Sequence, residues 1–121
     1  MPKKIVYSII LITGLLSHVF THAGDYQPLE GGFMVGGATL IDPSPQAPRN
    51  THYYIQLTGK SAEELYRLID ASAQYDECLD DGSMTKQQGA IQCTVSQDKV
   101  SHTCYFAIDV NRQILASGAG C

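Results

Sequence analysis

The sequence predicts an α+β domain in which one helix packs on a small antiparallel sheet of about four to five strands, held by two disulfides. Three observations favour this fold class. Residues 89–121 contain three short segments of alternating apolar and polar residues, separated by polar breaks. An amphipathic segment with a helix-start signal precedes them, directly after another strand pattern. Four cysteines, an even number, follow an amino terminus of the secretory type, which is typical of disulfide-linked exported domains.

The carboxy-terminal segments predict a three-strand meander. Their apolar positions alternate with a period of two, as expected for strands with one buried face. A turn at residues 98–99 places Cys93 opposite Cys104 and Val95 opposite His102, which puts both apolar sets on one face. A longer loop is compatible with the same pairing, because Asp-Lys is a mediocre two-residue turn. A third strand follows a turn at residues 111–113.

This register also predicts how the cysteines pair. Four cysteines allow three pairings. Residues opposite each other on neighbouring antiparallel strands have Cα atoms roughly 4.5–5.5 Å apart, and a disulfide can span that separation. We therefore expect Cys93–Cys104. The second pair, Cys78–Cys121, follows by elimination, since Cys78 lies in a predicted loop and Cys121 follows a Gly-Ala-Gly tether that can reach it.

The amino terminus has the pattern of a secretory signal over residues 1–23. Lys3 and Lys4 precede an apolar run over residues 5–16, and Ala23 ends a Thr-His-Ala site with small residues where a signal peptidase reads. The alternative is an uncleaved anchor helix, but the uninterrupted run is shorter than the roughly 20 residues that a membrane span needs. We therefore expect cleavage after Ala23, with no membrane span left in the exported product.

Charge limits the classes of partner. Residues 24–121 carry 6 of the 8 bases and all 12 acids, so their net charge is 6 − 12 = −6. Such an acidic domain is a poor nucleic-acid binder and a poor ligand for anionic membranes. It suits a cationic partner. The absence of an Asn-x-Ser/Thr glycosylation site favours a bacterial periplasm over a eukaryotic secretory route.

The exported part divides into an arm and a compact domain. Residues 24–48 form a Gly/Pro-rich extended arm, in which residues 33–41 are either an edge strand or disordered. Prolines at 43, 45 and 48 exclude a helix or a central strand there. Residues 49–121 form the disulfide-linked compact domain, and it begins with a strand over residues 51–58.

A helix is predicted over residues 62–73. Ser61 is the expected N-cap and Glu64 stands three residues later, which is the Ser-x-x-Glu capping box. Apolar residues then recur with helical spacing. Glu63 and Arg67 are four residues apart on the polar face, where they can pair. Residues 75–86 follow as a predicted loop.

Two features are candidates for partner binding. Four acids lie within six positions of the predicted loop, but they lack the spacing of a calcium-binding loop, so a solvated loop is the ordinary interpretation. Two tyrosines fall on the strand faces opposite the predicted core, where exposed aromatic side chains often contact partners; alternatively they cover the second side of the sheet. The candidate partner-binding residues are Asp76, Glu77, Asp80, Asp81, Tyr54 and Tyr105.

The sequence indicates no enzyme, cofactor or metal site. A phosphate-binding loop ending at Gly59-Lys60-Ser61 would need glycine where Tyr54 stands. Residues 24–121 contain two histidines, His52 and His102, and no nucleophile elbow or zinc-protease motif accompanies them. A Cys-x-x-Cys redox motif is also absent.

These observations lead to a functional expectation and two alternatives. We expect a small exported, periplasmic or secreted binding or inhibitor module that acts on another exported protein. One alternative is a small hydrolase or metal-dependent enzyme that uses His52 or His102 with the acids near Asp80. The other is a structural subunit of a secreted assembly, joined through the arm by strand addition.

The chain resembles small periplasmic lysozyme inhibitors in being exported, acidic, disulfide-linked and antiparallel. Ser117-Gly118-Ala119 is similar to part of their Ser-Gly-x-x-Tyr signature, but Cys121 stands in place of the tyrosine. The resemblance covers three residues, and the chain is not assigned to that family.

Overall fold

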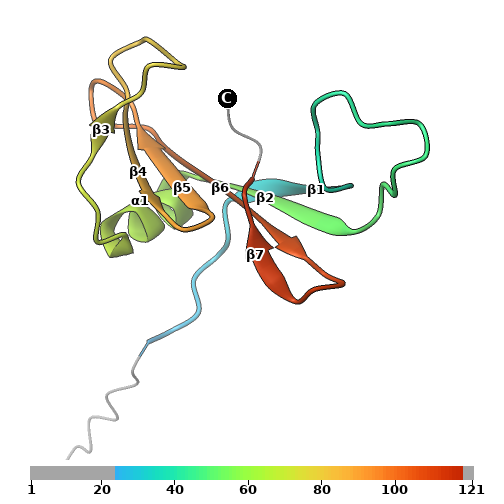
Figure 1. Cartoon of the computed structure of the whole chain (residues 1–121). Coiled ribbons are helices and arrows are strands. Elements are labelled where there is room, and N and C mark those ends of the chain that lie inside the picture. The colour runs from blue at the N-terminus through green and yellow to red at the C-terminus, as the bar shows by residue number, and fades with distance from the viewer. Residues whose placement is uncertain (1–23, 119–121) are drawn as a thin grey trace, which may run out of the picture.

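The computed structural model describes residues 24–118, which form one antiparallel sheet and one helix (Figure 1). The sheet order is β1-β2-β6-β5-β4-β3, and β7 pairs with β6. The prediction of one helix on an antiparallel sheet is confirmed, but seven strands replace the predicted four to five, and residues 24–118 show one of the two predicted disulfides. The elements are β1 (Gly31–Gly36), β2 (His52–Thr58), α1 (Gly59–Leu68), β3 (Gln74–Tyr75), β4 (Met84–Gln88), β5 (Ile91–Val95), β6 (His102–Asp109) and β7 (Ile114–Ala116).

The central hairpin of β5 and β6 has the predicted register. Cys93 lies opposite Cys104 and Val95 opposite His102. The turn is longer than two residues, because Ser96 still pairs with Ser101 and residues 97–100 form the loop. Lys99 takes the left-handed conformation there, with φ 63°. Cys93 and Cys104 form a disulfide with a Cα–Cα distance of 4.0 Å, and both are fully buried.

The helix begins and ends earlier than predicted. β2 runs directly into α1, so Thr58 is the N-cap, without a capping bond from its side chain. Ser61 lies within the first turn, and its Oγ accepts the Glu30 N–H at 2.8 Å instead of capping the helix. Ile69 ends the helix in an extended conformation and is buried against the core. The predicted capping box is therefore wrong, because strand pairing positions the helix start.

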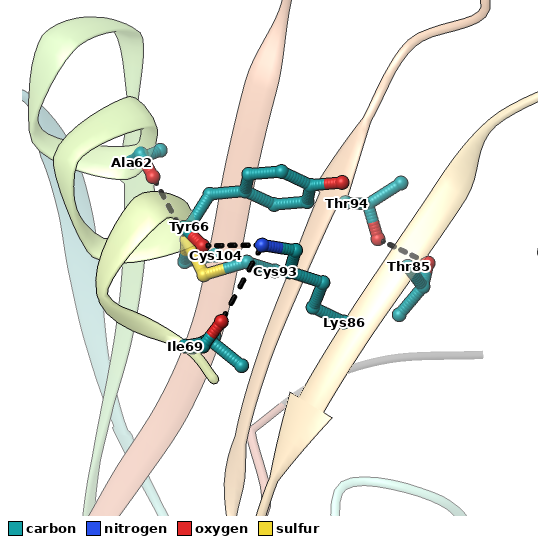
Figure 2. The surroundings of a disulfide bond; sticks show 8 residues. All are labelled: Ala62, Tyr66, Ile69, Thr85, Lys86, Cys93, Thr94 and Cys104. Carbon is teal, nitrogen blue, oxygen red and sulfur yellow. Dashed lines mark hydrogen bonds between the residues drawn. A yellow bond between two sulfur atoms is a disulfide. The ribbon is translucent and has the colours of Figure 1, made fainter. Parts of the chain in front are cut away.

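Two strands take the ends of the predicted loop over residues 75–86, and residues 76–83 between them form a loop as predicted. β3 and β4 pair with each other, and β4 pairs with β5 along its length. β4 has the polar sequence Met-Thr-Lys-Gln-Gln, which lacks apolar alternation. The Lys86 ammonium group nevertheless links β4 to the carboxy-terminal end of α1. It donates hydrogen bonds to the backbone carbonyls of Tyr66 and Ile69, both at 3.4 Å (Figure 2). Tertiary contacts, which are invisible in the sequence, make this polar segment a strand.

The arm contributes an edge strand to the sheet. β1 pairs with β2 over six residues, from Gly31 opposite Leu57 to Gly36 opposite His52. The strand thus ends before the predicted 33–41 segment does. A Cβ atom added to Gly37 would lie only 2.2 Å from the Pro48 carbonyl oxygen, so no larger residue fits at this position. Residues 37–51 loop back to β2.

The core lies between α1 and one face of the sheet. Its buried members come from β2, the helix region and the β5–β6 hairpin, and partly buried residues complete it. The buried members are Leu57, Ala62, Ile69, Cys93 and Cys104, and the partly buried ones are Ile55, Leu65, Tyr66, Ala71, Ile91 and Phe106. The opposite face of the sheet carries no helix among residues 24–118.

Candidate functional site

A broad groove crosses the sheet face opposite α1. Its volume is about 880 Å³. Strands β5 and β6 form the floor, and the loop between β3 and β4 lies along it together with residues from the chain after β7. The residues around it are Ile41, Asp76, Cys78, Leu79, Ser83, Gln92, Thr94, Ser96, Ser101, Thr103, Tyr105, Ser117 and Gly118. The lining is dominated by hydroxyl and amide side chains.

Strand register places four threonines in one row on this face. Thr58 lies opposite Thr103, Thr103 opposite Thr94, and Thr94 opposite Thr85. The hydroxyls of Thr85 and Thr94 are 2.7 Å apart and hydrogen-bonded (Figure 2). All four residues are half-buried. We call this set the threonine row.

A second row lies beside the threonines. Gln87 is opposite Gln92, Gln92 opposite Tyr105, and Tyr105 opposite Gln56. The Gln56 side-chain amide donates to the Tyr105 hydroxyl at 3.3 Å. The floor of the groove therefore combines neutral hydrogen-bonding groups with one aromatic ring, and it carries no formal charge.

The loop between β3 and β4 forms an acidic wall of the groove. Asp76 accepts hydrogen bonds from the Thr85 hydroxyl at 2.7 Å and from the backbone N–H groups of Leu79 and Cys78 at 2.9 and 3.1 Å. These bonds, with that from Thr85 the strongest, hold the pKa of the Asp76 carboxyl below its usual range. One carboxylate thus ties the loop to β4 and fixes its shape.

The other loop acids differ in their roles. Asp81 accepts the Ser83 N–H at 3.0 Å, and hydrogen bonds from Ser83 lower the pKa of its carboxyl. Asp80 accepts the Tyr75 hydroxyl, and this bond raises the pKa of Tyr75. Glu77 is exposed. The structure therefore brings Asp76 and Tyr105 to one groove, with Glu77, Asp80 and Asp81 on the loop beside it.

Tyr54 does not belong to an accessible surface. Only 5% of it is exposed, and its hydroxyl donates to the Gly37 carbonyl at 2.6 Å. Burial raises the pKa of this hydroxyl. The expected exposure of Tyr54 is wrong, because the start of the loop over residues 37–51 covers it. That cover comes from a segment 17 residues away, which alternation along β2 does not reveal.

The two histidines lie in separate places. His52 is buried beside Asp109, with 3.7 Å between its Nε2 and an Asp109 carboxylate oxygen, and its Nδ1 is 2.8 Å from the Thr51 hydroxyl. These three residues line a cavity of about 300 Å³ under the 37–48 segment. His102 packs edge-on against Tyr66 with 5.3 Å between ring centroids. The acid beside His52 is thus Asp109, from β6, rather than the predicted Asp80.

Residues 24–118 contain no group of three or more His, Cys, Asp or Glu side chains arranged to hold a metal ion. None of the helices in this part is long and apolar enough to cross a membrane. The predicted pair Cys78–Cys121 includes a residue outside the described range, so it stays a prediction, and so does the signal over residues 1–23.

Sequence reasoning missed the threonine row. Part of its signal is in the sequence, because Thr94 is next to Cys93 and Thr103 is next to Cys104. Alternation along a strand places each threonine on the face opposite its neighbouring cysteine. Thr85 carries no such signal, because the polar sequence around it predicts a loop. Compared with known protein families, with curated proteins and with solved structures, the chain has no significant match.

Proposed function

We propose that this protein is an exported binding module that recognises another exported protein through the groove opposite α1. The observation that carries the proposal is the groove itself, in which the neutral floor around Tyr105 meets the acidic wall built on Asp76. A concave surface with a few convergent polar groups is the usual form of a binding site.

The wall is suited to a basic partner. Its carboxylates lie in a loop that hydrogen bonds already order, so binding does not have to immobilise it, which preserves affinity. The net charge of −6 over residues 24–121 attracts a cationic protein at long range and speeds its association. In this proposal the floor supplies neutral hydrogen bonds and Tyr105 supplies aromatic contact.

An affinity experiment tests the proposal. The purified, oxidised protein is immobilised and exposed to an extract of exported proteins, and retained proteins are identified by mass spectrometry. We expect a basic protein to bind the wild type and to be lost with Thr103→Arg, which fills the groove with a bulky cation. Val100→Arg is the matched control, since Val100 is 75% exposed in the β5–β6 loop and does not line the groove.

The result can contradict the proposal in two ways. If Thr103→Arg retains the same partner with unchanged affinity, the groove is not the binding surface. If Val100→Arg loses the partner equally, added positive charge alone explains the loss and the groove is again not implicated.

A second candidate function is a small hydrolase centred on His52. The observation that favours it is the contact of His52 with both Thr51 and Asp109 at a cavity, which is the arrangement of a hydroxyl, a base and an orienting acid. A panel of ester and peptide substrates tests it. Activity that survives His52→Ala or Thr51→Val would remove this candidate.

A further inference from the structure

The helix covers only part of one sheet face. α1 packs over the half that carries Leu57, Cys93 and Cys104. The same face continues along β1, β2, β6 and β7 beyond the helix, and Figure 1 shows no further element of residues 24–118 over those strands. The proposed binding function does not use this half of the face.

Strand register makes this open half apolar. Val35 lies opposite Tyr53, Tyr53 opposite Ile108, and Ile108 opposite Leu115, so four strands contribute one side chain each to a line on one face. Phe33 stacks on Tyr53 with 4.9 Å between ring centroids. We call these five residues the apolar row. Tyr53 and Ile108 lie an even number of residues from Leu57 and Cys104 along β2 and β6, so the row is on the same face as the core.

The apolar row is exposed to a degree that is unusual for such residues in a monomer. The exposed fractions are 67% for Phe33, 58% for Val35, 37% for Ile108 and 49% for Leu115. Together they present a patch of about 400 Å², which falls in the range of the largest and often functional patches of soluble proteins. None of the five side chains is charged.

We propose that a second copy of this chain covers the apolar row, so that the protein is a homodimer in which the two sheets pack face to face beside the helices. A standard interface buries about 800 Å² on each partner, and in homodimers about 65% of it is apolar. The row supplies most of that apolar area.

The distribution of charge favours a second copy at this face. Two copies with a net charge of −6 over residues 24–121 repel each other, so an interface must keep their acids apart. The acidic loop lies between β3 and β4, at the end of the sheet order opposite β1. It also borders the groove on the other face. Packing through the row therefore keeps the acidic loops of the two copies apart.

This dimer has a consequence for binding. Because the groove and the row lie on opposite faces of one sheet, a twofold dimer leaves both grooves on its outer surfaces, facing away from each other. Each dimer then offers two equivalent sites, which can engage a multivalent partner with increased avidity. The inference about the dimer does not depend on what the groove binds.

Sedimentation equilibrium and light scattering test the proposal. We expect the purified, oxidised protein at about 50 μM to have twice the mass that mass spectrometry gives for one chain. A dimer dissociation constant below that concentration is typical of interfaces of this size. Leu115→Lys and Val35→Lys should weaken the dimer at least about 100-fold, because each buries an unpaired charge in an apolar interface.

Neighbouring residues on the same strands provide matched controls. Ile114→Lys and Met34→Lys change side chains that are each 44% exposed but point to the opposite face of β7 and β1. Both control variants should remain dimeric. Circular dichroism melts of all four variants verify folding before their masses are compared.

Three results would overturn the proposal. One is a monomeric wild type at that concentration. Another is equal dimer loss from Ile114→Lys and Leu115→Lys. The third is a dimer that survives Leu115→Lys but is lost with both Met34→Lys and Val35→Lys, since this would indicate pairing of the exposed β1 edges instead. The expected pattern, loss only from the row variants, supports the face-to-face dimer.

Discussion

Tyr54 shows how one side chain joins the arm to the sheet. Its ring is buried on the groove side of β2, and its hydroxyl donates to the carbonyl of Gly37, which is buried as well. The ring also lies 5.9 Å from that of His52, measured between centroids. A hydroxyl that looks like a surface group in the sequence therefore serves as an internal anchor.

Tyr54→Phe should lower the free energy of unfolding by about 1–3 kcal/mol, because it leaves the buried Gly37 carbonyl without its donor. Urea unfolding followed by circular dichroism measures the change. Tyr26→Phe is the control, since Tyr26 is 106% exposed. Equal stability of the Tyr54 variant and the wild type would show that water replaces the hydroxyl without cost.

Asp76 has a similar role in the acidic loop. Hydrogen bonds from Thr85, Leu79 and Cys78 favour its ionised form and lower the pKa of its carboxyl. The folded state therefore binds this proton less readily than the unfolded state does. The resulting stabilisation is complete above the ordinary aspartate pKa, and it is lost as pH falls through the lowered folded-state pKa.

Asp76→Asn should destabilise the protein at neutral pH and make its loss of stability in acid shallower. Urea midpoints measured at pH 7 and at about pH 3, below the ordinary aspartate pKa, give both quantities. Glu77→Gln, which removes the same charge from an exposed neighbour, should change neither appreciably. A parallel acid decline in the Asn variant and the wild type would contradict the role of Asp76.

At the level of elements, β1 and the loop after it lie outside the core cluster. Every member of that cluster comes from residues 55–106. β1 nevertheless pairs with β2 over six residues, and the loop after it covers Tyr54. The arm thus adds an edge to the sheet without building its centre.

A chain beginning at Arg49 should therefore still unfold cooperatively, but at a lower urea midpoint than the chain that retains the arm. The reason is that the core and the Cys93–Cys104 disulfide are intact, while the pairing of β1 with β2 is lost. Urea unfolding monitored by two probes tests cooperativity. Non-coincident transitions of the shortened chain would show that the arm belongs to the folding unit.

The hairpin of β5 and β6 was predictable from local pattern. Cys93, Val95 and Cys104 alternate with polar residues, and only one register places both apolar sets on one face. The start of α1 was not predictable in the same way. Its capping signal at Ser61 is real in sequence, but β2 ends where the helix starts, and the Ser61 hydroxyl binds Glu30 from the arm.

At the level of the whole molecule, a predicted second disulfide would decide how firmly the acidic loop is held. We predict that Cys78 pairs with Cys121, which would tie the loop over residues 76–81 to the end of the chain. The closed loop of more than 40 residues would stabilise the fold by roughly 4 kcal/mol in the chain-entropy model.

Proteolysis under non-reducing conditions, followed by mass spectrometry, tests this pairing. We expect one peptide pair that joins Cys78 to the carboxy terminus and another that joins Cys93 to Cys104. The same sample after reduction is the control, in which both pairs should separate. Recovery of Cys78 linked to Cys93 would contradict both the hairpin register and the attached loop.

The sequence by itself determined the fold class, the strand over β2, the β5–β6 register and the pairing of Cys93 with Cys104. These features depend on the period of apolar residues and on neighbours in the chain, which are local properties. It also gave Asp76 and Tyr105 as candidate binding residues, and the structure places both at one groove.

Tertiary structure alone decided the burial of Tyr54, the strand β4, the threonine row and the apolar row. Each depends on which strands become neighbours, and that is set by pairing between segments far apart in the chain. Val35 and Leu115 lie 80 residues apart in sequence, yet pairing through Tyr53 and Ile108 places them on one face. Periodicity shows which side of its own strand a residue occupies, but it cannot show whether another layer covers that side.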